Sequence, residues 1–306
     1  MYDVHRLRLL RELARRGTLA SVANALGYNP SSISHQLGLL ERETGVTLLE
    51  PSGRGVRLTP AARALVTHAE NILRELELAE ATVAASRGEV TGTVRIATFQ
   101  TAARGLVLDA IEQLANAHPR LTVAFTHVDA GAAIPALIAR DFDIVLSEEY
   151  PGAPLPRDPA IVSRLSLTDP LILAIPAEWQ ESSLEELAAR PWVMEHAGTA
   201  ARNWSDATCR SAGFEPHVVF ETADLFLHAD VVDRGLAAAF LPGLGPSPAS
   251  AKRVETGQAR AVTLYVRSGG ENSPAVAAVS AAIAATAGIE APERSQSRRD
   301  ARRLEA

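Results

Sequence analysis

The chain has 306 residues, 47% of them hydrophobic and 22% charged, with a formal net charge of -6 and a single cysteine. A single hydrophobic core stops growing at about 250 to 300 residues, so this length favours two or three globular domains. The lone Cys209 excludes an internal disulfide, and we expect it to be a small buried residue. No apolar run reaches the roughly 18 residues of a membrane span and no signal peptide is recognisable, which predicts a cytoplasmic protein without membrane contacts.

The N-terminal segment is basic within an acidic protein. Residues 1–63 contain nine arginines and five acidic residues. Because charges are screened beyond about 8 to 10 Å, a local basic cluster can meet a polyanion although the whole chain is acidic. The asymmetry favours a nucleic-acid-binding module joined to a different domain.

Three short helices are predicted in this segment. The apolar spacing of residues 4–13 indicates a first helix that ends at Gly17, and Thr18 is the expected N-cap of a second helix that ends at Gly27. Asn29 is expected to cap a third helix through its side-chain oxygen, with Pro30 at the first helical position. Two helices joined by a short turn that contains glycine predict a helix-turn-helix, whose second helix is the recognition helix.

The third helix has an outward face of small polar side chains, while Ile33, Leu37 and Leu40 point inward. Short hydroxyl groups let a helix approach DNA closely, so base edges or phosphates are the expected contacts. A solvated helix surface is the alternative for each serine taken singly. The candidate DNA-binding residues here are Asn29, Ser31, Ser32, Ser34 and His35.

The stretch VTLLEPSGRGVRLTP predicts a β-hairpin wing, because two short apolar strands flank a turn with two glycines. Arg54 lies at its tip. Together with Arg57, it is expected to grip the DNA backbone or the minor groove beside the recognition helix.

A long helix is predicted from Pro60 to about Arg87. Apolar residues along it alternate steps of four and three, the spacing of a coiled-coil seam. Packing on its own domain is the alternative, but flanking glutamates and an arginine favour a dimer. The predicted seam consists of Leu65, Ala69, Ile72, Leu76, Ala79 and Val83.

After Gly88, strand-length segments such as TVRIAT and FDIVLS alternate with helical segments, which predicts parallel sheets with covering helices in two α/β subdomains. The first subdomain is expected to span 91–161 and to take the chain back over 267–290. The second is expected to span 162–266. The tail, 291–306, lacks an apolar face and is predicted to be disordered.

Ligands of open α/β sheets lie beyond the carboxyl ends of strands, often at helix N-termini. Phe99, Gln100 and Thr101 follow one predicted strand and open a helix. Thr199 and Thr222 occupy corresponding places in the second unit. These five residues are the candidate effector-binding residues, with ordinary capping or turn roles as the alternative.

No catalytic or metal-binding constellation is predicted. The chain lacks the GxSxG, HExxH, GxxxxGK and GxGxxG patterns, and the neighbours Glu195 and His196 have no third partner. No cofactor is therefore expected besides an unknown small-molecule effector. A solute-binding protein would explain 91–290, but it needs an export signal and leaves 1–87 unexplained.

The segment TLASVANALGYNPSSISHQLGLLERETGVTLLEPSGRGVRLTPAARAL resembles the winged helix-turn-helix of LysR-type transcriptional regulators nearly residue for residue. RLSLTDPLILAIPAEW, SLEELAARPWVM, RSAGFEPHVVFET and GLAAAFLP sit where that family places segments of its effector-binding region. The resemblance implies a bacterial regulator that is not an enzyme, with a C-terminal region of periplasmic-binding-protein type. It also implies homodimers or homotetramers, and a phosphate or backbone contact for Ser34.

The chain departs from the family pattern around the wing. Where the family usually has Leu-Phe-x-Arg, residues 48–51 read LLEP, and Ala62 replaces a common glycine. Arg54 and Arg57 are therefore expected to make the phosphate contact that the family's usual arginine makes.

These inferences describe a multi-domain α+β protein, with a winged helix-turn-helix over 1–59, a linker and dimerisation helix over 60–87, and two α/β subdomains. The expected partners are double-stranded DNA with an inverted-repeat operator, a small-molecule effector, a second copy of the chain, and RNA polymerase if the regulator is an activator.

Overall fold

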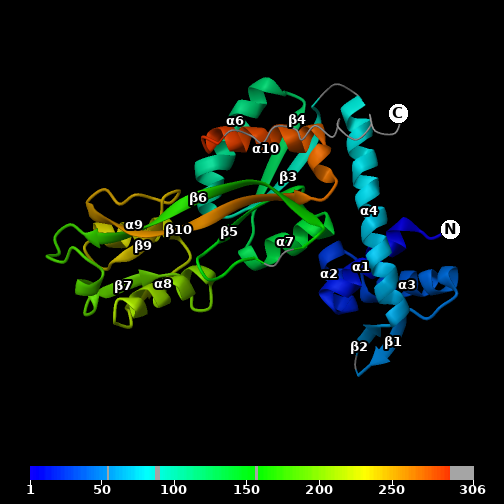
Figure 1. Cartoon of the computed structure of the whole chain (residues 1–306), viewed down its shortest axis with the longest axis horizontal. Helices are drawn as coiled ribbons and strands as arrows, with labels where there is room; N and C mark the ends of the chain where they lie inside the picture. The colour runs from blue at the N-terminus through cyan, green and yellow to red at the C-terminus, as the bar shows by residue number, and fades with distance from the viewer. Residues whose placement is uncertain (54, 87–89, 156–157, 290–306) are drawn as a thin grey trace, which may run out of the picture.

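The computed structural model describes residues 1–53, 55–86, 90–155 and 158–289. A helical N-terminal domain, one long helix and an elongated α/β region follow one another along the chain (Figure 1). Within the described ranges, no helix is long and apolar enough to cross a membrane. The predictions made for Arg54, for Arg87 and for 291–306 fall outside the described residues.

The N-terminal domain consists of α1 (Val4–Arg16), α2 (Leu19–Leu26) and α3 (Pro30–Thr44). Its helix ends follow the predicted signals. Gly17 and Gly27 adopt left-handed conformations with φ of 76° and 69°, and the Oγ1 of Thr18 accepts the backbone N–H of Ser21 at 3.1 Å. Because the inward faces of the three helices are apolar, they share one core with the start of the long helix.

The prediction that the Asn29 side chain caps α3 is wrong. Asn29 occupies the N-cap position, but its side chain makes no capping hydrogen bond. Its backbone carbonyl instead accepts the N–H groups of Ser32 at 3.1 Å and Ile33 at 3.3 Å. Because Pro30 has no backbone N–H, the first turn of α3 needs one hydrogen-bond acceptor fewer. The side chain of Asn29 is exposed and has no capping role.

The predicted wing is confirmed as an antiparallel hairpin of β1 (Leu49–Ser52) and β2 (Gly55–Leu58). The long helix α4 (Pro60–Ser86) then begins behind Thr59, whose Oγ1 accepts the backbone N–H of Ala62 at 3.1 Å. The linker helix thus starts directly at the base of the wing.

The α/β region is built on a six-stranded sheet of order β4-β3-β5-β10-β6-β9. In it, β3, β4 and β5 run parallel to one another, whereas β10 is antiparallel to β5 and β6, and β9 is antiparallel to β6. The strands are β3 (Gly92–Thr98), β4 (Leu121–His127), β5 (Ile144–Glu149), β6 (Ile161–Pro176), β9 (Ala239–Pro242) and β10 (Ala251–Arg267).

The expectation of parallel sheets is therefore correct only for part of the region. The other parallel pair is β7 (Pro191–Met194) with β8 (His217–Glu221). The reason for the difference is that β6 and β10, of 16 and 17 residues, each run through both subdomains in opposite directions.

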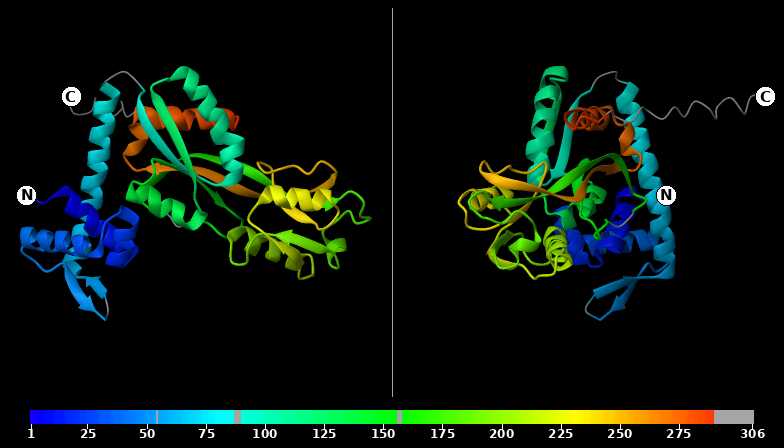
Figure 2. Two further views of the ribbon diagram at one scale, coloured as in Figure 1. Left: turned by 180° about the vertical axis from the view of Figure 1, so that it is seen from behind. Right: turned by 60° about the vertical axis from the view of Figure 1, so that its left-hand side comes forward.

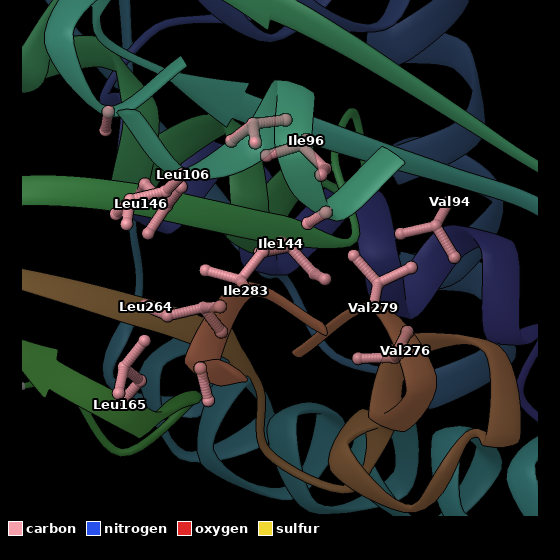
Figure 3. Close-up of a cluster of buried hydrophobic side chains, with 14 of the residues drawn as sticks. Val94, Ile96, Leu106, Ile144, Leu146, Leu165, Leu264, Val276, Val279 and Ile283 are labelled. Atoms are coloured by element: carbon pink, nitrogen blue, oxygen red, sulfur yellow. The ribbon is translucent and has the colours of Figure 1, made fainter. Parts of the chain in front are cut away.

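The first subdomain has its core between the sheet and a layer of helices. Figure 3 shows Ile96 and Ile144 from the strands facing Leu106 and Ile283 from the helices. The helices around this core are α5 (Gln100–Ala102), the π-helix η1 (Ala103–Val107), α6 (Leu108–Ala117) and α10 (Pro274–Thr286). On the opposite face of the sheet, α7 (Ala130–Ala139) packs against β3 and β5.

The second subdomain surrounds an aromatic core in which Trp192 stacks on Phe240 and Trp204 meets Phe240 edge to face. Cys209 is fully buried there, as predicted. Its remaining elements are α8 (Ala200–Ser211), α9 (Leu225–Asp233) and a short 3₁₀ turn (Glu185–Leu187); another such turn (Gly270–Asn272) precedes α10.

The two long strands divide between the cores near their middles. Leu165 of β6 and Val262 of β10 belong to the first core, whereas Leu171 and Val254 pack in the second. The boundaries expected at 161/162 and 266/267 lie at the ends of these strands instead. Because each strand serves both cores, the subdomains are joined by continuous sheet rather than by flexible loops.

Candidate functional site

The polar residues predicted to face DNA lie on the outer surface of α3. Ser31, Ser32, Ser34 and His35 are all exposed, while Ile33, Leu37 and Leu40, on the inner surface, are at most 1% exposed. The inner residues fix the rotation of the helix about its axis. The polar face is therefore presented to solvent by the packing of the opposite face.

The wing projects from the N-terminal domain beside α3 (Figure 2). Its Arg57 is exposed, and Nη2 lies 2.6 Å from the Oε2 of Glu50 on the facing strand. An exposed pair of this kind contributes little stability, so Arg57 can exchange Glu50 for a phosphate at small cost.

Two contacts that the sequence did not predict hold α3 and the wing in place. The Oε1 of Glu41 accepts the backbone N–H groups of Leu48 at 2.7 Å and Leu49 at 3.0 Å, where α3 leads into the wing. On α1, the Nε of Arg6 donates to the Oε1 of Gln36 at 3.0 Å. These bonds position the wing without the family's usual arginine near Pro51.

A buried charge cluster lies where the two subdomains meet. Arg260 of β10 is 1% exposed; its Nε donates to the Oδ2 of Asp169 at 2.8 Å, and its Nη1 pairs with Glu148. Its Nη2 donates to the Oγ1 of Thr101 at 2.7 Å, and its guanidinium lies 5.1 Å from the ring centroid of Phe99. Two predicted effector residues are thus engaged by an arginine of the same chain.

Burial and neighbouring charges shift the pKa values of this cluster. Burial acts to lower the pKa of Arg260, but Tyr150, Glu148 and Asp169 together raise it. Burial raises the pKa of Glu148, and the nearby Arg260 offsets only part of that rise. The guanidinium therefore stays charged at any physiological pH, as a fixed positive centre.

Glu195, close to this cluster, is an acidic group whose pKa lies near neutral pH. Burial, followed by the charge of Glu148, raises the pKa of Glu195 to about 7. Its protonation state can therefore respond to the charge of a bound molecule.

The two subdomains also touch each other directly through side chains of α5, η1 and α9. The Nε2 of Gln100 donates to the Oδ1 of Asp224 at 3.1 Å, and the guanidinium of Arg104 lies 4.2 Å from the ring centroid of Phe226. The Oδ1 of Asp224 also accepts the backbone N–H of Phe226 at 2.9 Å at the start of α9. The facing sides of the two subdomains are thus in direct contact here.

Thr199 and Thr222 are placed on the second wall in local roles. The Oγ1 of Thr199 accepts the N–H of Arg202 at 3.1 Å and so caps α8, while that of Thr222 accepts the N–H of Asp224 at 3.1 Å. Thr222 reaches the contact between the walls through Asp224, whereas Thr199 lies on the loop beyond Glu195. The capping and turn roles foreseen as the alternative are therefore present.

A small cavity of about 20 Å³ lies behind the cleft, lined by Tyr150, Glu195 and His228 among others. Its size suits one water molecule. The Nε2 of His228 contacts the carbonyl of Thr222 at 2.9 Å, and its Nδ1 is buried without a partner among the described residues. None of the five predicted effector residues lines this cavity.

The N-terminal domain is docked on the first subdomain at the C-terminal end of α7. The Nη2 of Arg11 donates to the carbonyl of Ile138 at 2.9 Å, and Arg8 donates to the carbonyl of Ala139. From β10, the Nη1 of Arg267 donates to the carbonyl of Leu137 at 3.2 Å. The last carbonyls of a helix have no partner within it and carry its negative dipole end, so cations bind there.

The linker helix is held to the same place. Glu77 of α4 lies 2.7 Å from both Arg140 and Arg267, measured between its Oε1 and their Nη2 and Nε. Gly269 has φ of +94°, and a Cβ there would lie 2.8 Å from the carbonyl oxygen of Arg74. Only glycine therefore allows this approach of α4, and Figure 2 shows the helix running along the first subdomain.

The comparisons with known proteins agree with this architecture. Residues 4–63 match the bacterial regulatory helix-turn-helix proteins of the lysR family, and residues 87–288 match the LysR substrate binding domain. The chain is 26% identical over 246 residues to the transcriptional dual regulator GltC of Bacillus subtilis (strain 168), covering 78% of this chain and 80% of GltC. It is 27% identical over 297 residues to the HTH-type transcriptional regulator GalR of Pseudomonas putida, covering 92% and 74%.

Among solved structures, a full-length OxyR variant from Pseudomonas aeruginosa has a TM-score of 0.64 at 18% identity, over 96% of this chain and 99% of that one. HinK, a LysR family transcriptional regulator from the same organism, has a TM-score of 0.53 at 18% identity, over 92% and 98%. These likenesses show a shared fold for the whole chain.

A helix-turn-helix joined by a long helix to a two-part α/β ligand-binding region defines a DNA-binding regulator. The chain belongs to the LysR family: it is a LysR-type transcriptional regulator with a DNA-binding domain and an effector-binding domain.

The buried charge cluster was missed by the sequence reading, although a signal was present. Asp169 interrupts the apolar strand RLSLTDPLILAIP, and Arg260 interrupts QARAVTLYV. Charged residues are almost never fully buried unless paired, so two opposite charges inside two apolar strands indicate a buried ion pair.

Replacing Arg260 with methionine leaves the carboxylate of Asp169, which is 2% exposed, without its partner. We expect a loss of about 3 to 5 kcal/mol in the free energy of unfolding of the α/β region. Adding Asp169→Asn should restore part of it, because the unpaired charge disappears while an oxygen remains for the N–H of Leu244. Chemical denaturation followed by tryptophan fluorescence measures both, since all three tryptophans lie in this region.

The exposed Arg210, replaced by methionine, is the matched control and should change stability by less than about 0.5 kcal/mol. A loss for Arg260→Met no larger than that of the control would show that the cluster does not stabilise the fold.

Proposed function

We propose that this LysR-type regulator reads an inverted-repeat operator as a homodimer or a dimer of dimers, with α3 in the major groove. The observation that carries the proposal is the exposed polar face of α3, fixed by fully buried apolar residues on its inner side and flanked by the wing. Asn29, Ser31, Ser32 and His35 are proposed to contact base edges or phosphates. Ser34 is proposed to contact a phosphate, and Arg57, with Arg54, the adjoining backbone or minor groove.

The proposed dimer forms along the exposed part of the α4 seam. Ile72 and Val83 are 39% and 57% exposed, and Ala79 is exposed between them. Leu65 and Ala69 instead pack in the core of their own domain, where Ala69 is fully buried. The seam available to a second copy is therefore Ile72, Leu76, Ala79 and Val83, the part that lies beyond the N-terminal domain.

The effector is proposed to bind in the cleft between the subdomains, between Phe99, Gln100 and Thr101 on one wall and Thr199 and Thr222 on the other. Support comes from the buried Oε1 of Gln100, which has no partner among the described residues. An effector that replaces the bond from Gln100 to Asp224 changes how the walls meet. The effector alters DNA binding only if its affinity differs between the arrangement with this bond and the arrangement without it.

In this proposal the protein acts in the cytoplasm, where its operator lies, and contacts RNA polymerase if it is an activator. The chemistry proposed is recognition without catalysis: the charged groups of the cleft are paired with one another or face the effector, and none is assigned to bond making or breaking.

Selection of bound duplexes from a random pool tests the DNA reading. We expect enrichment of an inverted repeat with half-sites about one helical turn apart. His35→Ala should relax the base preference at one position of each half-site. Arg57→Gln should weaken binding to all sequences alike and reduce the slope of log affinity against log salt concentration by about one. Arg210→Gln, far from α3, is the control. Selection without any enriched sequence at physiological salt would contradict the proposal, and a uniform loss for His35→Ala would show that this residue does not read bases.

Sedimentation tests the dimer seam. Val83→Glu places a charge in the exposed seam, so we expect the dimer to dissociate at least tenfold more readily, because an unpaired charge cannot be buried between two helices. Thr82→Glu, one residue earlier and off the seam, should leave the assembly unchanged. Equal behaviour of the two variants would remove α4 from the interface.

A further inference from the structure

A cavity of about 190 Å³ lies at the junction where α1 and α4 dock on the first subdomain. It is lined by Arg11 of α1, by Leu73 and Arg74 of α4, by Ile138 and Arg140 at the end of α7, and by Arg267 of β10. It is separate from the site of the proposed effector, since none of those residues lines it. The DNA-binding domain, the linker helix and the first subdomain each contribute to its lining.

Four arginines and two glutamates line the cavity. Arg11 pairs with Glu12, and Arg267 pairs with Asp143 as well as with Glu77, which it shares with Arg140. Arg74 differs, because its ion pair among the described residues is with Glu75, at 3.9 Å on the surface of α4. Arg74 is therefore the arginine of the lining with the weakest pairing.

One guanidinium group of the lining has a buried nitrogen without an aligned hydrogen bond. Arg11 is 5% exposed, and its Nε and Nη2 donate to Glu12 and to the carbonyl of Ile138. The Nη2 of Arg140, in contrast, is buried without an aligned hydrogen bond, although it lies 2.7 Å from Glu77. A buried donor of this kind is normally satisfied, so an acceptor beside Arg140 is indicated.

The pKa values of two arginines at this junction, Arg8 and Arg11, are lowered, chiefly by burial. Burial lowers the pKa of Arg8, and the charges of Arg140 and Arg11 lower it further. Burial also lowers the pKa of Arg11; Glu12 opposes this, while Arg15 and Arg140 add to it. An anion bound among these groups would relieve their mutual repulsion.

Beside the polar Thr67, Asn71 and Ser268, part of the remaining wall is apolar, and the volume is close to that of one ring. Leu73, Ile138, Pro159 and Ala160 supply aliphatic surface. An engineered apolar cavity of about 150 Å³ holds benzene, so about 190 Å³ leaves room for a ring with one carboxylate. Guanidinium groups bind carboxylates through paired, charge-assisted hydrogen bonds.

We propose that this junction cavity is a second ligand site, which takes a small carboxylate with an apolar body of about one ring. Because its walls come from α1, α4 and the first subdomain, a bound carboxylate stabilises the docked arrangement over any other. That regulatory consequence rests on the proposed function, whereas the binding itself does not.

Calorimetric titration of the full-length protein with benzoate, without DNA, tests the site. We expect one benzoate per chain, and at least tenfold weaker binding of benzamide, which has the same shape but no charge. Arg74→Gln should weaken benzoate at least tenfold, while Arg210→Gln, another exposed arginine paired with a nearby glutamate, should not change it. Ala160→Leu fills the cavity and should abolish binding with the melting temperature retained.

A further variant distinguishes the junction from the effector cleft. Gln100→Ala, in the cleft, should leave benzoate binding unchanged. Benzoate binding that is lost in Gln100→Ala but kept in Ala160→Leu would overturn the proposal, as would equal affinities for benzoate and benzamide or no binding of benzoate. None of these results depends on whether the protein binds an operator.

Discussion

Three guanidinium groups converge on the last carbonyls of α7, and the arrangement of the whole chain depends on this contact. Arg8 and Arg11 come from the DNA-binding domain and Arg267 from the sheet. A helix end buried without partners would leave several carbonyls unsatisfied, each at a cost of about 1 to 3 kcal/mol. The contact therefore satisfies α7 and, at the same time, fixes the N-terminal domain against the effector-binding region.

The same helix leads back to the cleft. Its inner face, with Ala133 and Leu137, packs on Ala97 and Val145 of β3 and β5. At its other end, the N–H of Val128 donates to the carbonyl of Thr98, immediately before the cleft residues that follow β3. A rearrangement at the end of β3 thus has a packed helix between it and the DNA-binding domain. Such a contiguous element can carry coupling when it has two stable positions.

The buried pair of Asp169 and Arg260 sets the limits of such a rearrangement. It lies on β6 and β10, the strands that both subdomains share, and the Oδ1 of Asp169 also accepts the N–H of Leu244 at 2.9 Å. Separating the pair would expose two buried charges, which opposes any change in the register of these strands. The contacts from Gln100 to Asp224 and from Arg104 to Phe226 are exposed or half-buried by comparison, and in the proposed function they are the ones that an effector replaces.

The N-terminal domain was largely predictable because its signals are local. Helix spacing, the left-handed glycines at 17 and 27, and the cap at Thr18 act within a few residues, and the wing followed from its turn. The prediction for Asn29 was wrong because its backbone carbonyl takes the place of a side-chain cap, and the sequence does not show which of the two groups will accept the bond. The antiparallel β6 and β10 were missed because periodicity shows that a strand exists but not which distant strand it pairs with. The docking of Arg11 on Ile138 joins residues 127 positions apart and leaves no pattern in the sequence.

The docked position of the DNA-binding domain is the central claim, and a distance measurement between spin labels tests it directly. Labels are placed on Ser34→Cys in α3 and Ala117→Cys at the end of α6, in chains diluted with unlabelled protein. Cys209 stays unlabelled because it is buried and its pKa is raised to about 12, which keeps it a thiol. We expect one narrow distance distribution, which broadens when Arg8→Ala and Arg11→Ala are combined. A broad distribution in the parent protein, or one that the double variant leaves unchanged, would contradict the account.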